Sequence, residues 1–367
     1  MVRRGTADVG NRVSGRGRSR ITLFETGGNE MRIIIDAMGG DNAPLAIVQG
    51  AIDALKEIDD EIILVGDEAL IRNTLEAKHY KGDRISVVHT TEVIGNDEAP
   101  VRAVRSKKDS SIVRGLNMLK NGEGDVFLSA GSTGALLAGG LFILGRIQGI
   151  DRPTLATVYP VIGHQPSILV DTGANAECKP NNLLEFGIMG SIYMEKVLGR
   201  EKPTVGLINN GTEEGKGTAL TKTAYDLFKK SHLNFAGYIE ARELQNAVVD
   251  VIVTDGFTGN AILKLTEGMG LMVLREMKSR FLETTKSKLG AMLLKKQLMG
   301  IKKEFNYAEY GGAPLLGVKG AMLKMHGSSD ALAVKQTIIK AVPYVEEKVV
   351  ETIQNSVLEI EEILISE

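Results

Sequence analysis

Short apolar runs rich in Ile and Val alternate with stretches of helical period along most of the chain. Such runs are typical of strands that are buried on both faces of a parallel sheet, with helices covering those faces. The pattern predicts a three-layer α/β fold with a mostly parallel sheet. The predicted strands are Arg32–Ile35, Ile62–Val65, Ile85–Val88, Val126–Leu128, Ser167–Val170, Thr204–Ile208, Val251–Val253 and Met322–Lys324. The clearest predicted helices are Pro44–Glu57, Leu183–Val197, Leu220–Lys230 and Ala331–Ala341.

Most of the predicted strands run directly into glycines and small polar residues. Because the carboxyl ends of parallel strands meet at one edge of an open sheet, we expect the turns that follow them to converge on one crevice. Two of the units, residues 125–135 and 250–260, match each other at Asp, Val, Gly, Thr and Gly positions. The turns are Asp36–Asn42, Ser129–Gly134, Asp171–Asn175, Asn209–Glu213 and Thr254–Asn260.

Glycine-rich turns that lead into helices favour a bound anion, phosphate above all. They offer backbone N–H groups and the positive end of a helix dipole. The alternative is that these glycines only end turns or helices. No G-x-G-x-x-G follows a strand, and residues 211–218 have the wrong spacing for a Walker A loop, which disfavours NAD and ATP.

Polar side chains in these turns are candidates for the chemistry of the crevice. Lysine would supply the positive charge that glycine turns lack, and the alternative for each lysine is a solvated side chain. Asp and Asn also commonly cap helices or close Asx turns. The candidates are Asp36, Asp41, Asp171, Asn175, Lys179, Asn209, Glu213, Lys216, Asp255, Asn260 and Lys264.

A second group of candidates lies near the C-terminus. Apolar runs on either side of residues 318–320 predict two strands around a turn, after which His326 precedes a helix that begins near Ala331. Ser328 or Ser329 is the predicted N-cap. A histidine at this place is a candidate proton donor or oxyanion partner; the alternative is that it only ends the strand.

The chain carries no recognisable nucleophile motif. There is no G-x-S-x-G elbow, and the one cysteine, Cys178, has no histidine near it in the sequence. There is also no H-E-x-x-H or paired-cysteine pattern, so no zinc site is predicted. This inventory favours a mechanism without a covalent enzyme intermediate, a metal or another cofactor.

Composition limits the compartment and the partners. A formal net charge of −2 gives no overall field for nucleic acid. A single cysteine allows no intrachain disulfide, and the apolar runs are shorter than the ~20 residues that cross a bilayer. We therefore expect a cytoplasmic protein that binds no nucleic acid.

Two segments differ from the rest of the chain. Residues 1–30 hold six Arg and six Gly with little aliphatic pattern, which predicts a disordered leader or a non-native extension before a single α/β domain over residues 31–367. Lys264–Lys303 holds ten Lys or Arg against three Glu, with Met and Leu at helical spacing. This predicts a protruding basic amphipathic segment, residues 264–305, that contacts a membrane, an acidic carrier or a second subunit. A plain helical hairpin is the alternative.

Several long motifs resemble the bacterial acyl-ACP:phosphate acyltransferases, where ACP is acyl carrier protein. The resemblance extends from about residue 31 to about residue 345, and Ser132 stands where much of that family has Asn. The motifs are Arg32–Pro44, Ser129–Leu136, Asp171–Asn175, Cys178–Pro180, Phe186–Tyr193, Asn210–Gly217, Thr254–Asn260, Tyr310–Gly317 and His326–Asp330.

The resemblance implies a fold related to phosphotransacetylases and to isocitrate or isopropylmalate dehydrogenases. It also implies a homodimer that associates peripherally with membranes. The implied reaction moves a long-chain fatty acyl group from ACP to inorganic phosphate. The acyl phosphate would pass to the acyl-phosphate glycerol-3-phosphate acyltransferase, for phosphatidic acid and phospholipid synthesis.

With this resemblance, we expect phosphate to attack the thioester directly. The expected catalytic residues are His326, Asn260, Lys179 and Asp255, with backbone amides near Gly256–Gly259 as further oxyanion donors. A metal-dependent decarboxylating dehydrogenase and a non-catalytic adaptor remain alternatives. The expected phosphate- and phosphopantetheine-binding residues are Asp36, Gly39, Gly40, Asp41, Gly131, Ser132, Thr133, Gly134, Asp171, Asn175, Asn209, Glu213, Lys216, Gly256, Thr258, Gly259, Lys264 and Ser328.

Overall fold

The computed structural model describes residues 30–161, 163–304 and 310–366. Residues Met31–Glu367 form one compact unit. The leader predicted over residues 1–30 lies outside the described residues, apart from Glu30.

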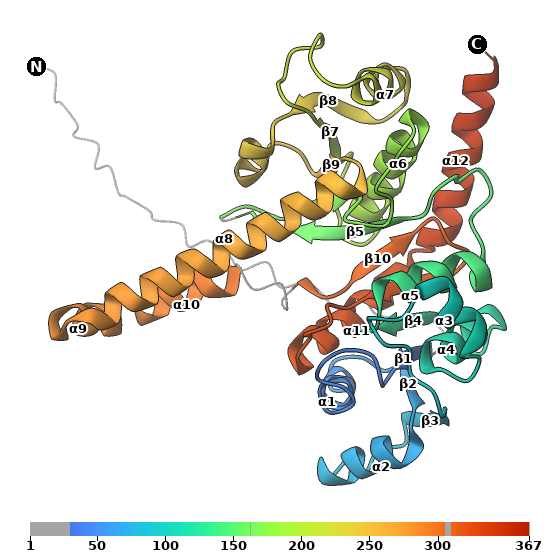
Figure 1. The fold of residues 1–367 in the computed structure, drawn as a ribbon, viewed down its shortest axis with the longest axis vertical. Helices are drawn as coiled ribbons and strands as arrows, with labels where there is room; N and C mark the ends of the chain where they lie inside the picture. The colour runs from blue at the N-terminus through green and yellow to red at the C-terminus, as the bar shows by residue number, and fades with distance from the viewer. Residues whose placement is uncertain (1–29, 162, 305–309, 367) are drawn as a thin grey trace, which may run out of the picture. The chain divides into compact units, whose positions relative to one another are not determined.

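An eleven-stranded sheet forms the centre of the described residues (Figure 1). Its order is β3-β2-β1-β4-β11-β10-β5-β6-β9-β7-β8. All eight of these predicted strands are confirmed; β10 was predicted separately, as the first of two strands around a turn, and β5 and β8 were not predicted. The strands are β1 (Arg32–Asp36), β2 (Glu61–Gly66), β3 (Ile85–His89), β4 (Val126–Ser129), β5 (Thr154–Tyr159), β6 (Ser167–Val170), β7 (Thr204–Ile208), β8 (Asn234–Ile239), β9 (Val251–Val253), β10 (Ala313–Leu316) and β11 (Ala321–Lys324).

Helices cover both faces of the sheet, which confirms the three-layer α/β class. The helices are α1 (Leu45–Ala54), α2 (Glu68–Ala77), α3 (Pro100–Ser106), α4 (Ser111–Lys120), α5 (Thr133–Gly139), α6 (Pro180–Lys196), α7 (Ala219–Lys230), α8 (Gly256–Glu283), α9 (Thr285–Leu293), α10 (Lys295–Glu304), α11 (Ala331–Glu346) and α12 (Val349–Ser366). A π-helical turn follows α5 over Gly140–Leu144, and a 3₁₀ turn spans Ala241–Asn246.

The centre of β1, Ile33–Ile35, shows why a buried strand is apolar. Successive side chains of a strand point to opposite faces of the sheet. Ile33 and Ile35 pack into a core with α1, α6, α11 and α12, whereas Ile34 packs into a second core with α3, α4 and α5. All three side chains are fully buried. A strand covered on both faces has no position left for a polar residue.

The strands of the sheet do not all run the same way. β10 is antiparallel to both β11 and β5, and β5 is antiparallel to β6. Along the sheet, β6, β9, β7 and β8 are therefore reversed relative to β1, β2, β3, β4 and β11. The expectation that all the glycine turns share one edge of the sheet is wrong, because the antiparallel strands β5 and β10 reverse the direction of the strands that follow them in the sheet. The sequence did not reveal this, because an apolar run does not indicate whether a strand pairs in parallel or antiparallel.

The strand pair β10 and β11 was predicted as two strands around a turn, and this is confirmed. The N-cap predicted for the next helix is wrong. Asp330, rather than Ser328 or Ser329, caps α11, with its carboxylate accepting from the Ala333 amide at 2.9 Å. Ser328 is used differently, in a contact with His326.

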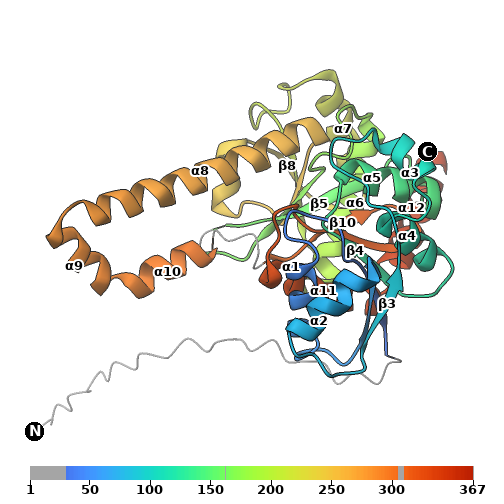
Figure 2. The same cartoon turned by 60° about the horizontal axis from the view of Figure 1, so that its bottom comes forward.

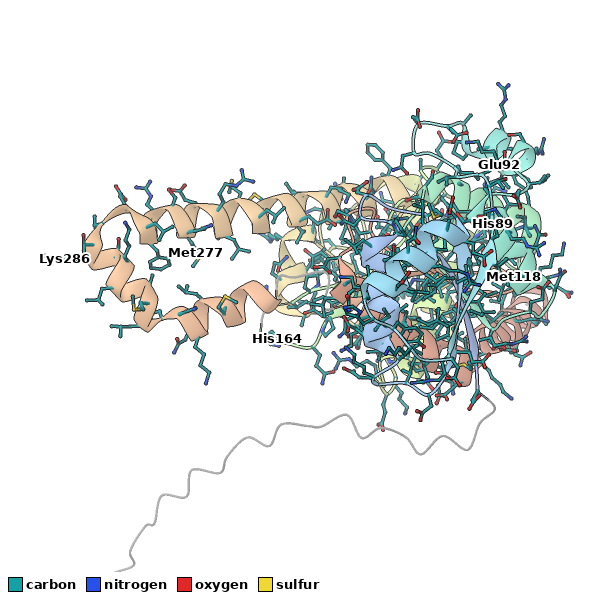
Figure 3. The ribbon with its side chains drawn as sticks, turned by 90° about the horizontal axis from the view of Figure 1, so that it is seen from below. His89, Glu92, Met118, His164, Met277 and Lys286 are labelled. Carbon is teal, nitrogen blue, oxygen red and sulfur yellow. The ribbon has the colours of Figure 1, made fainter. Side chains whose placement is uncertain are left out.

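Helices α8, α9 and α10 contain the basic, methionine-rich segment. Helix α8 extends away from the sheet, α9 turns the chain, and α10 runs back (Figure 2). Met277 lies along α8 and Lys286 lies near the turn (Figure 3). Within the described part of the chain, no helix is long and apolar enough to cross a membrane.

Candidate active site

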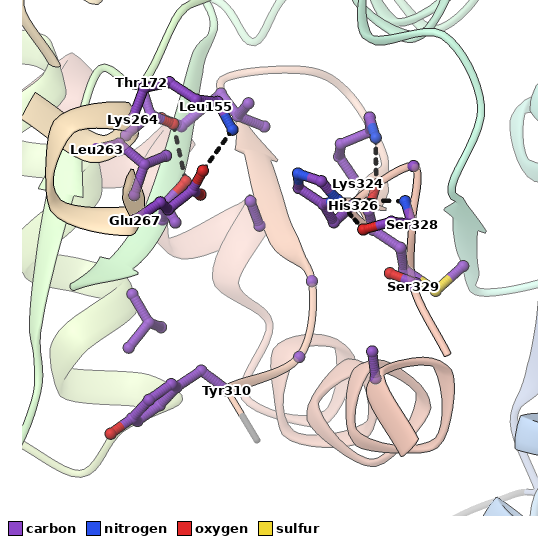
Figure 4. A pocket seen from close by; sticks show the side chains of 18 of the residues that line it. Leu155, Thr172, Leu263, Lys264, Glu267, Tyr310, Lys324, His326, Ser328 and Ser329 are labelled. Atoms are coloured by element: carbon purple, nitrogen blue, oxygen red, sulfur yellow. Dashed lines mark hydrogen bonds and ion pairs between the residues drawn. The ribbon is translucent and has the colours of Figure 1, made fainter. Parts of the chain in front are cut away.

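A cavity of about 700 Å³ lies between the first half of α8 and the segment that joins β11 to α11. Lys324, His326 and Ser328 line one side of it, and Thr172, Lys264 and Glu267 face them from the other side (Figure 4). Of the predicted site residues, the structure places five in the cavity wall: Thr133, Asn260, Lys264, His326 and Ser328.

Contacts from Ser328 determine which ring nitrogen of His326 carries a proton. The Ser328 backbone N–H donates to Nδ1 of His326 at 3.2 Å, and the Ser328 hydroxyl lies 2.8 Å from the same nitrogen. A nitrogen that accepts has no proton of its own, so neutral His326 is protonated at Nε2. The neutral ring can therefore donate a hydrogen bond through Nε2.

The surroundings of His326 also keep it neutral. Burial lowers the pKa of His326, and the positive charge of Lys264 lowers it further. Because the usual pKa of histidine is already below 7, the ring is uncharged at neutral pH. Neutral His326 is suited to donate a hydrogen bond from Nε2 to a developing negative charge.

Lys324 supplies a positive charge from the end of β11. Burial lowers the pKa of Lys324 to about 8, while the charge of Asp36 opposes this shift. Its Nζ also donates to the carbonyl of Met325. Lys324 remains mostly protonated at neutral pH, so the cavity has lysines on two sides, Lys324 and Lys264. Lys264 pairs with Glu267 at 2.7 Å.

Asp36 joins the turns that follow β1 and β4. Its fully buried carboxylate accepts from the Ser129 hydroxyl at 2.6 Å and from the Met38 amide at 3.0 Å. Burial raises the pKa of Asp36. A Cβ at Gly39 would lie 2.4 Å from the Asp36 carboxylate and 2.6 Å from the Gly131 nitrogen. These predicted site residues contact one another beneath the cavity wall.

The next residues of the same turn support the His326 segment. Gly40 has a φ of 97°, a conformation that glycine adopts without strain. The Asp41 amide then donates to the Gly327 carbonyl at 2.7 Å, and the Asn42 side chain donates to the carbonyls of Ser328 and Ser329. The turn after β1 thus positions the residues that line the cavity.

The turn after β4 contributes one side chain to the cavity. Ser132 caps the seven-residue helix α5 through the Ala135 amide, at 3.5 Å. Thr133 lines the cavity. Gly134 allows close contact with Pro100, whose Cγ would lie 2.5 Å from a Cβ at residue 134.

Asp171 closes the turn after β6. Its buried carboxylate accepts from the amides of Leu155, Gly173, Ala174 and Asn175, at 2.6–3.2 Å. Burial raises the pKa of Asp171, although these hydrogen bonds act to lower it. Asn175 adds side-chain bonds to Asp171 and to the Pro153 carbonyl. Both predicted residues hold the backbone, while their neighbours Thr172 and Gly173 line the cavity.

Most backbone N–H groups in the N-terminal turn of α8 already donate hydrogen bonds within the protein. Asp255 accepts from both the amide and the hydroxyl of Thr258, and its carbonyl accepts from the Gly259 amide. The Gly256 amide donates to the Asn175 carbonyl at 2.7 Å. The hypothesis that amides near Gly256–Gly259 stabilise an oxyanion therefore conflicts with the structure, because three of these amides already have partners.

Four of the predicted residues that do not line the cavity have partners in other turns. Asn209, Glu213 and Lys216 form their own cluster after β7, in which Lys216 pairs with Glu213 at 2.8 Å and Asn209 donates to the Gly211 carbonyl. Lys179 is 79% exposed and lies 3.9 Å from Asp151. β9 separates β7 from β6 in the sheet, which takes the β7 turn away from Thr172.

The most important residue that the sequence analysis missed is Lys324. It ends an apolar strand two positions before His326, and a lysine at that place was the available signal. Glu267 and Thr172 were also missed, because they lie in an otherwise ordinary helix and turn.

The fold places the chain in a known structural class. It is similar to a phosphotransacetylase from Streptococcus pyogenes, with a TM-score of 0.58 at 16% identity over 87% of this chain and 95% of that chain. A branched-chain phosphotransacylase from Enterococcus faecalis V583 matches with a TM-score of 0.53 at 13% identity over 86% and 99%. The predicted relation to phosphotransacetylases is confirmed for the fold.

Sequence similarity identifies the family within this class. A family model described as "Fatty acid synthesis protein" matches residues 31–352. A phosphate acyltransferase from Alkaliphilus oremlandii is 55% identical over 89% of this chain and 97% of its own length, and one from Clostridioides difficile is 51% identical over 88% and 95%. The chain belongs to this family of phosphate acyltransferases, which confirms the predicted family and enzyme class.

Proposed function

We propose that the enzyme transfers a long-chain acyl group from the ACP thioester to inorganic phosphate, giving acyl phosphate for phospholipid synthesis. The observation that carries the proposal is the cavity that holds two lysines and a neutral, donating histidine. Lys324 supplies positive charge for phosphate, together with Lys264, whose charge is shared with Glu267, and His326 matches the charge that develops on an acyl carbonyl or a leaving thiolate.

The proposed reaction is a single displacement. A phosphate oxygen forms a bond to the thioester carbonyl carbon, and the carbon–sulfur bond of the tetrahedral intermediate then breaks. The proton that hydrogen phosphate loses on becoming acyl phosphate passes to the leaving thiolate, and neutral His326 stabilises the developing negative charge with a hydrogen bond from Nε2. Asn260, which also lines the cavity, is the proposed donor to the oxyanion.

Positioning provides most of the rate in this proposal. Phosphate is a competent nucleophile near neutral pH, so no strong base is required. Holding two reactants in attack geometry lowers a barrier by about 7–11 kcal/mol, and one oxyanion donor contributes about 3–4 kcal/mol. Both effects depend on the rigid turns that hold the His326 segment.

Cys178 supports a route without an acyl-enzyme. Burial and, to a smaller extent, the charge of Asp171 raise the pKa of the Cys178 thiol to about 11. Its sulfur contacts the Asn175 carbonyl at 3.6 Å. A thiol with such a pKa is almost entirely protonated at neutral pH and is a poor nucleophile.

The test is phosphate-dependent release of the ACP thiol. Enzyme and palmitoyl-ACP are mixed with a thiol reagent, with and without phosphate, in the absence of added metal and nucleotide. We expect release only with phosphate. Equal release in both mixtures would overturn the proposal, and an acyl group trapped on Cys178 or a serine without phosphate would overturn the single displacement.

We further propose a cytoplasmic, peripherally membrane-associated homodimer that uses helices α8–α10 for contacts with membrane, carrier or subunit. Large apolar side chains of this segment are exposed beside its lysines, including Leu271, Met272, Met292 and Leu293. Replacing Lys286, Lys288 and Lys295 by Glu is expected to reduce flotation with anionic vesicles while thiol release from a soluble donor persists. Unchanged flotation would contradict the membrane role.

A further inference from the structure

One surface outside the cavity wall combines exposed apolar side chains with positive charge. It consists of the outer face of α3 and the π-helical turn that follows α5, and we call it the α3 surface. In α3, Ala103 and Val104 are buried. Val101, Arg102 and Arg105 point outward and are exposed. Helix α3 and the two residues after it hold two Arg and two Lys, and no Asp or Glu.

Arg105 is held against an exposed aromatic ring. Its Cζ atom lies 5.3 Å from the centroid of the Phe142 ring, and Phe142, in the π-helical turn, is 55% exposed. The face of an aromatic ring attracts a cation, so this contact orients the guanidinium while its N–H groups stay available for a partner. Among the described residues, no carboxylate forms an ion pair with Arg102 or Arg105.

The α3 surface lies next to the cavity. Thr133, the first residue of α5, lines the cavity and is itself exposed, which places it where the cavity meets solvent. The next residue, Gly134, packs against Pro100, the first residue of α3. Helices α3 and α5 lie side by side (Figure 1). Arg105 is five residues beyond Pro100, or about 7.5 Å along the helix axis. A partner bound to the α3 surface therefore stands beside the cavity.

We infer that the α3 surface is where the carrier protein of the acyl donor docks, through a helix with acidic and apolar side chains. This inference rests on the proposed function, because a carrier-bound acyl group reaches His326 only if the carrier stands at an opening of the cavity. The guanidinium groups of Arg102 and Arg105 match carboxylates.

The composition of the α3 surface also matches a protein partner. Arginine and aromatic residues are enriched in protein interfaces, and the exposed side chains of Val101 and Phe142 fit the apolar positions of an amphipathic helix. A second copy of the chain at this place would obstruct the opening beside Thr133, whereas a carrier that delivers the acyl group has to stand there.

The experiment compares the double variant Arg102→Glu, Arg105→Glu with the double variant Lys78→Glu, Lys81→Glu. The lysine control changes the net charge by the same amount, on exposed residues at the end of α2 and just after it, outside the cavity wall. The kcat/KM at saturating phosphate is measured with palmitoyl-ACP and with submicellar palmitoyl-phosphopantetheine, which has the same arm without the protein. Circular dichroism melting, light scattering and flotation with anionic vesicles report folding, assembly and membrane binding.

We expect the arginine variant to lower kcat/KM for palmitoyl-ACP at least tenfold relative to palmitoyl-phosphopantetheine, because only the carrier offers carboxylates to the α3 surface. The lysine control should keep the ratio of the two values within about twofold of wild type. Phe142→Ser should lower the same ratio at least fivefold. Higher ionic strength should lower the wild-type kcat/KM for palmitoyl-ACP and should affect the arginine variant less.

Several outcomes would overturn the inference. An unchanged ratio in the arginine variant would do so. An equal loss with both donors would assign the arginines to the phosphate of the arm or to catalysis. A change in assembly or in flotation without a change in the ratio would assign the α3 surface to a second subunit or to a membrane. An equal fall of the ratio in the lysine control would show that overall charge, and not this surface, attracts the carrier.

Failure of the docking surface is distinguishable from failure of the proposed function. If the wild-type enzyme releases thiol from both donors equally with and without phosphate, the reaction is misassigned whatever the variants do. If release depends on phosphate but the arginine variant keeps the wild-type ratio, the reaction stands and the carrier docks elsewhere. A photoreactive amino acid adds a direct readout: crosslinks to ACP are expected from position 101, and crosslinks from position 78 alone would contradict the inference.

Discussion

Gly259, in the first turn of α8, lies directly against the backbone of Asp171. A Cβ at Gly259 would stand 1.9 Å from the Asp171 carbonyl oxygen. The neighbouring Gly256 is equally constrained, since its Cβ would lie 2.6 Å from the Asn175 carbonyl oxygen. The turn after β6 and the start of α8 are thus in backbone contact, and this contact sets the position of Asn260 in the cavity.

Gly259→Ala should therefore damage both stability and activity. The new methyl group has no flexible neighbour to displace, so α8 has to move away from Asp171. We expect the free energy of unfolding to fall by about 2 kcal/mol or more, and kcat to fall because Asn260 moves with the helix. Urea unfolding and steady-state kinetics measure the two effects.

Gly268→Ala is the matched control in the same helix. A Cβ at Gly268 meets no atom within 4 Å, and alanine is favoured over glycine inside a helix by about 0.5–1 kcal/mol. This variant should be at least as stable as wild type. If Gly259→Ala behaves in the same way, the contact with Asp171 has no energetic role.

Lys324 should determine how phosphate binding depends on pH. Its pKa is lowered to about 8, so the ammonium that attracts phosphate is lost as the pH rises through about 8. We expect kcat/KM for phosphate to fall over that range, measured from pH 6 to pH 9.5 at constant ionic strength. In Lys324→Met this fall in kcat/KM at alkaline pH (the alkaline limb) should disappear, and KM for phosphate should rise at least tenfold.

Lys335→Met is the control for Lys324. Lys335 pairs with Glu57 outside the cavity wall, so its loss should leave KM for phosphate within about twofold and keep the alkaline limb. An alkaline limb that persists in Lys324→Met would assign the titration to another group.

His326→Asn should lower kcat by about 10²–10³-fold with a much smaller effect on KM for phosphate. The wild-type enzyme should also lose activity in acid, because protonation of Nδ1 conflicts with the N–H that Ser328 donates to it. Since the pKa of His326 is lowered, this loss should begin below the usual pKa of histidine. A kcat that is unaffected by the substitution would remove His326 from the mechanism.

Ser328→Ala separates the two contacts that Ser328 makes with His326. The substitution removes the hydroxyl at 2.8 Å but retains the backbone N–H that specifies the tautomer. We expect a loss in kcat of less than tenfold. A loss as large as that of His326→Asn would give the hydroxyl itself a role in the reaction.

Lys216→Ala tests the prediction that Lys216 binds phosphate, which the position of the β7 turn does not support. Lys216 is half exposed and pairs with Glu213 in the turn after β7, so KM for phosphate should stay within about twofold of wild type. If Lys216→Ala weakens phosphate binding as strongly as Lys324→Met does, the β7 turn must rearrange to reach the substrate.

Local features of the fold were predictable because they depend on neighbouring residues. The buried runs Ile33–Ile35 of β1 and Val126–Leu128 of β4 are continuously apolar, and the amphipathic helices α7 and α11 begin within a residue of their predicted starts. β8 was missed because Gly237 and polar neighbours interrupt its pattern. His326, Asn260 and Lys264 were predicted as polar groups at strand ends and helix starts, and they do meet in one cavity.

Long-range features were not predictable in this way. Asp36 and Asp171 were predicted to bind substrate and Asp255 to act in catalysis, yet their carboxylates accept hydrogen bonds from nearby backbone and hydroxyl groups. An aspartate that closes a turn and an aspartate that binds a ligand have the same sequence signature. Lys324 was missed because its burial and its nearness to Lys264 arise only when β11 and α8 are brought together.

The sequence by itself determined the α/β class, the order of most strands and helices, and the family, because buried strands, helical periodicity and long motifs are written in neighbouring residues. Tertiary structure decided which turns meet. The antiparallel strands β5 and β10 reverse the second half of the sheet, which places the β6 turn and α8 opposite His326 and leaves the β7 turn outside. Direction of pairing depends on contacts between distant segments, and no local pattern encodes it.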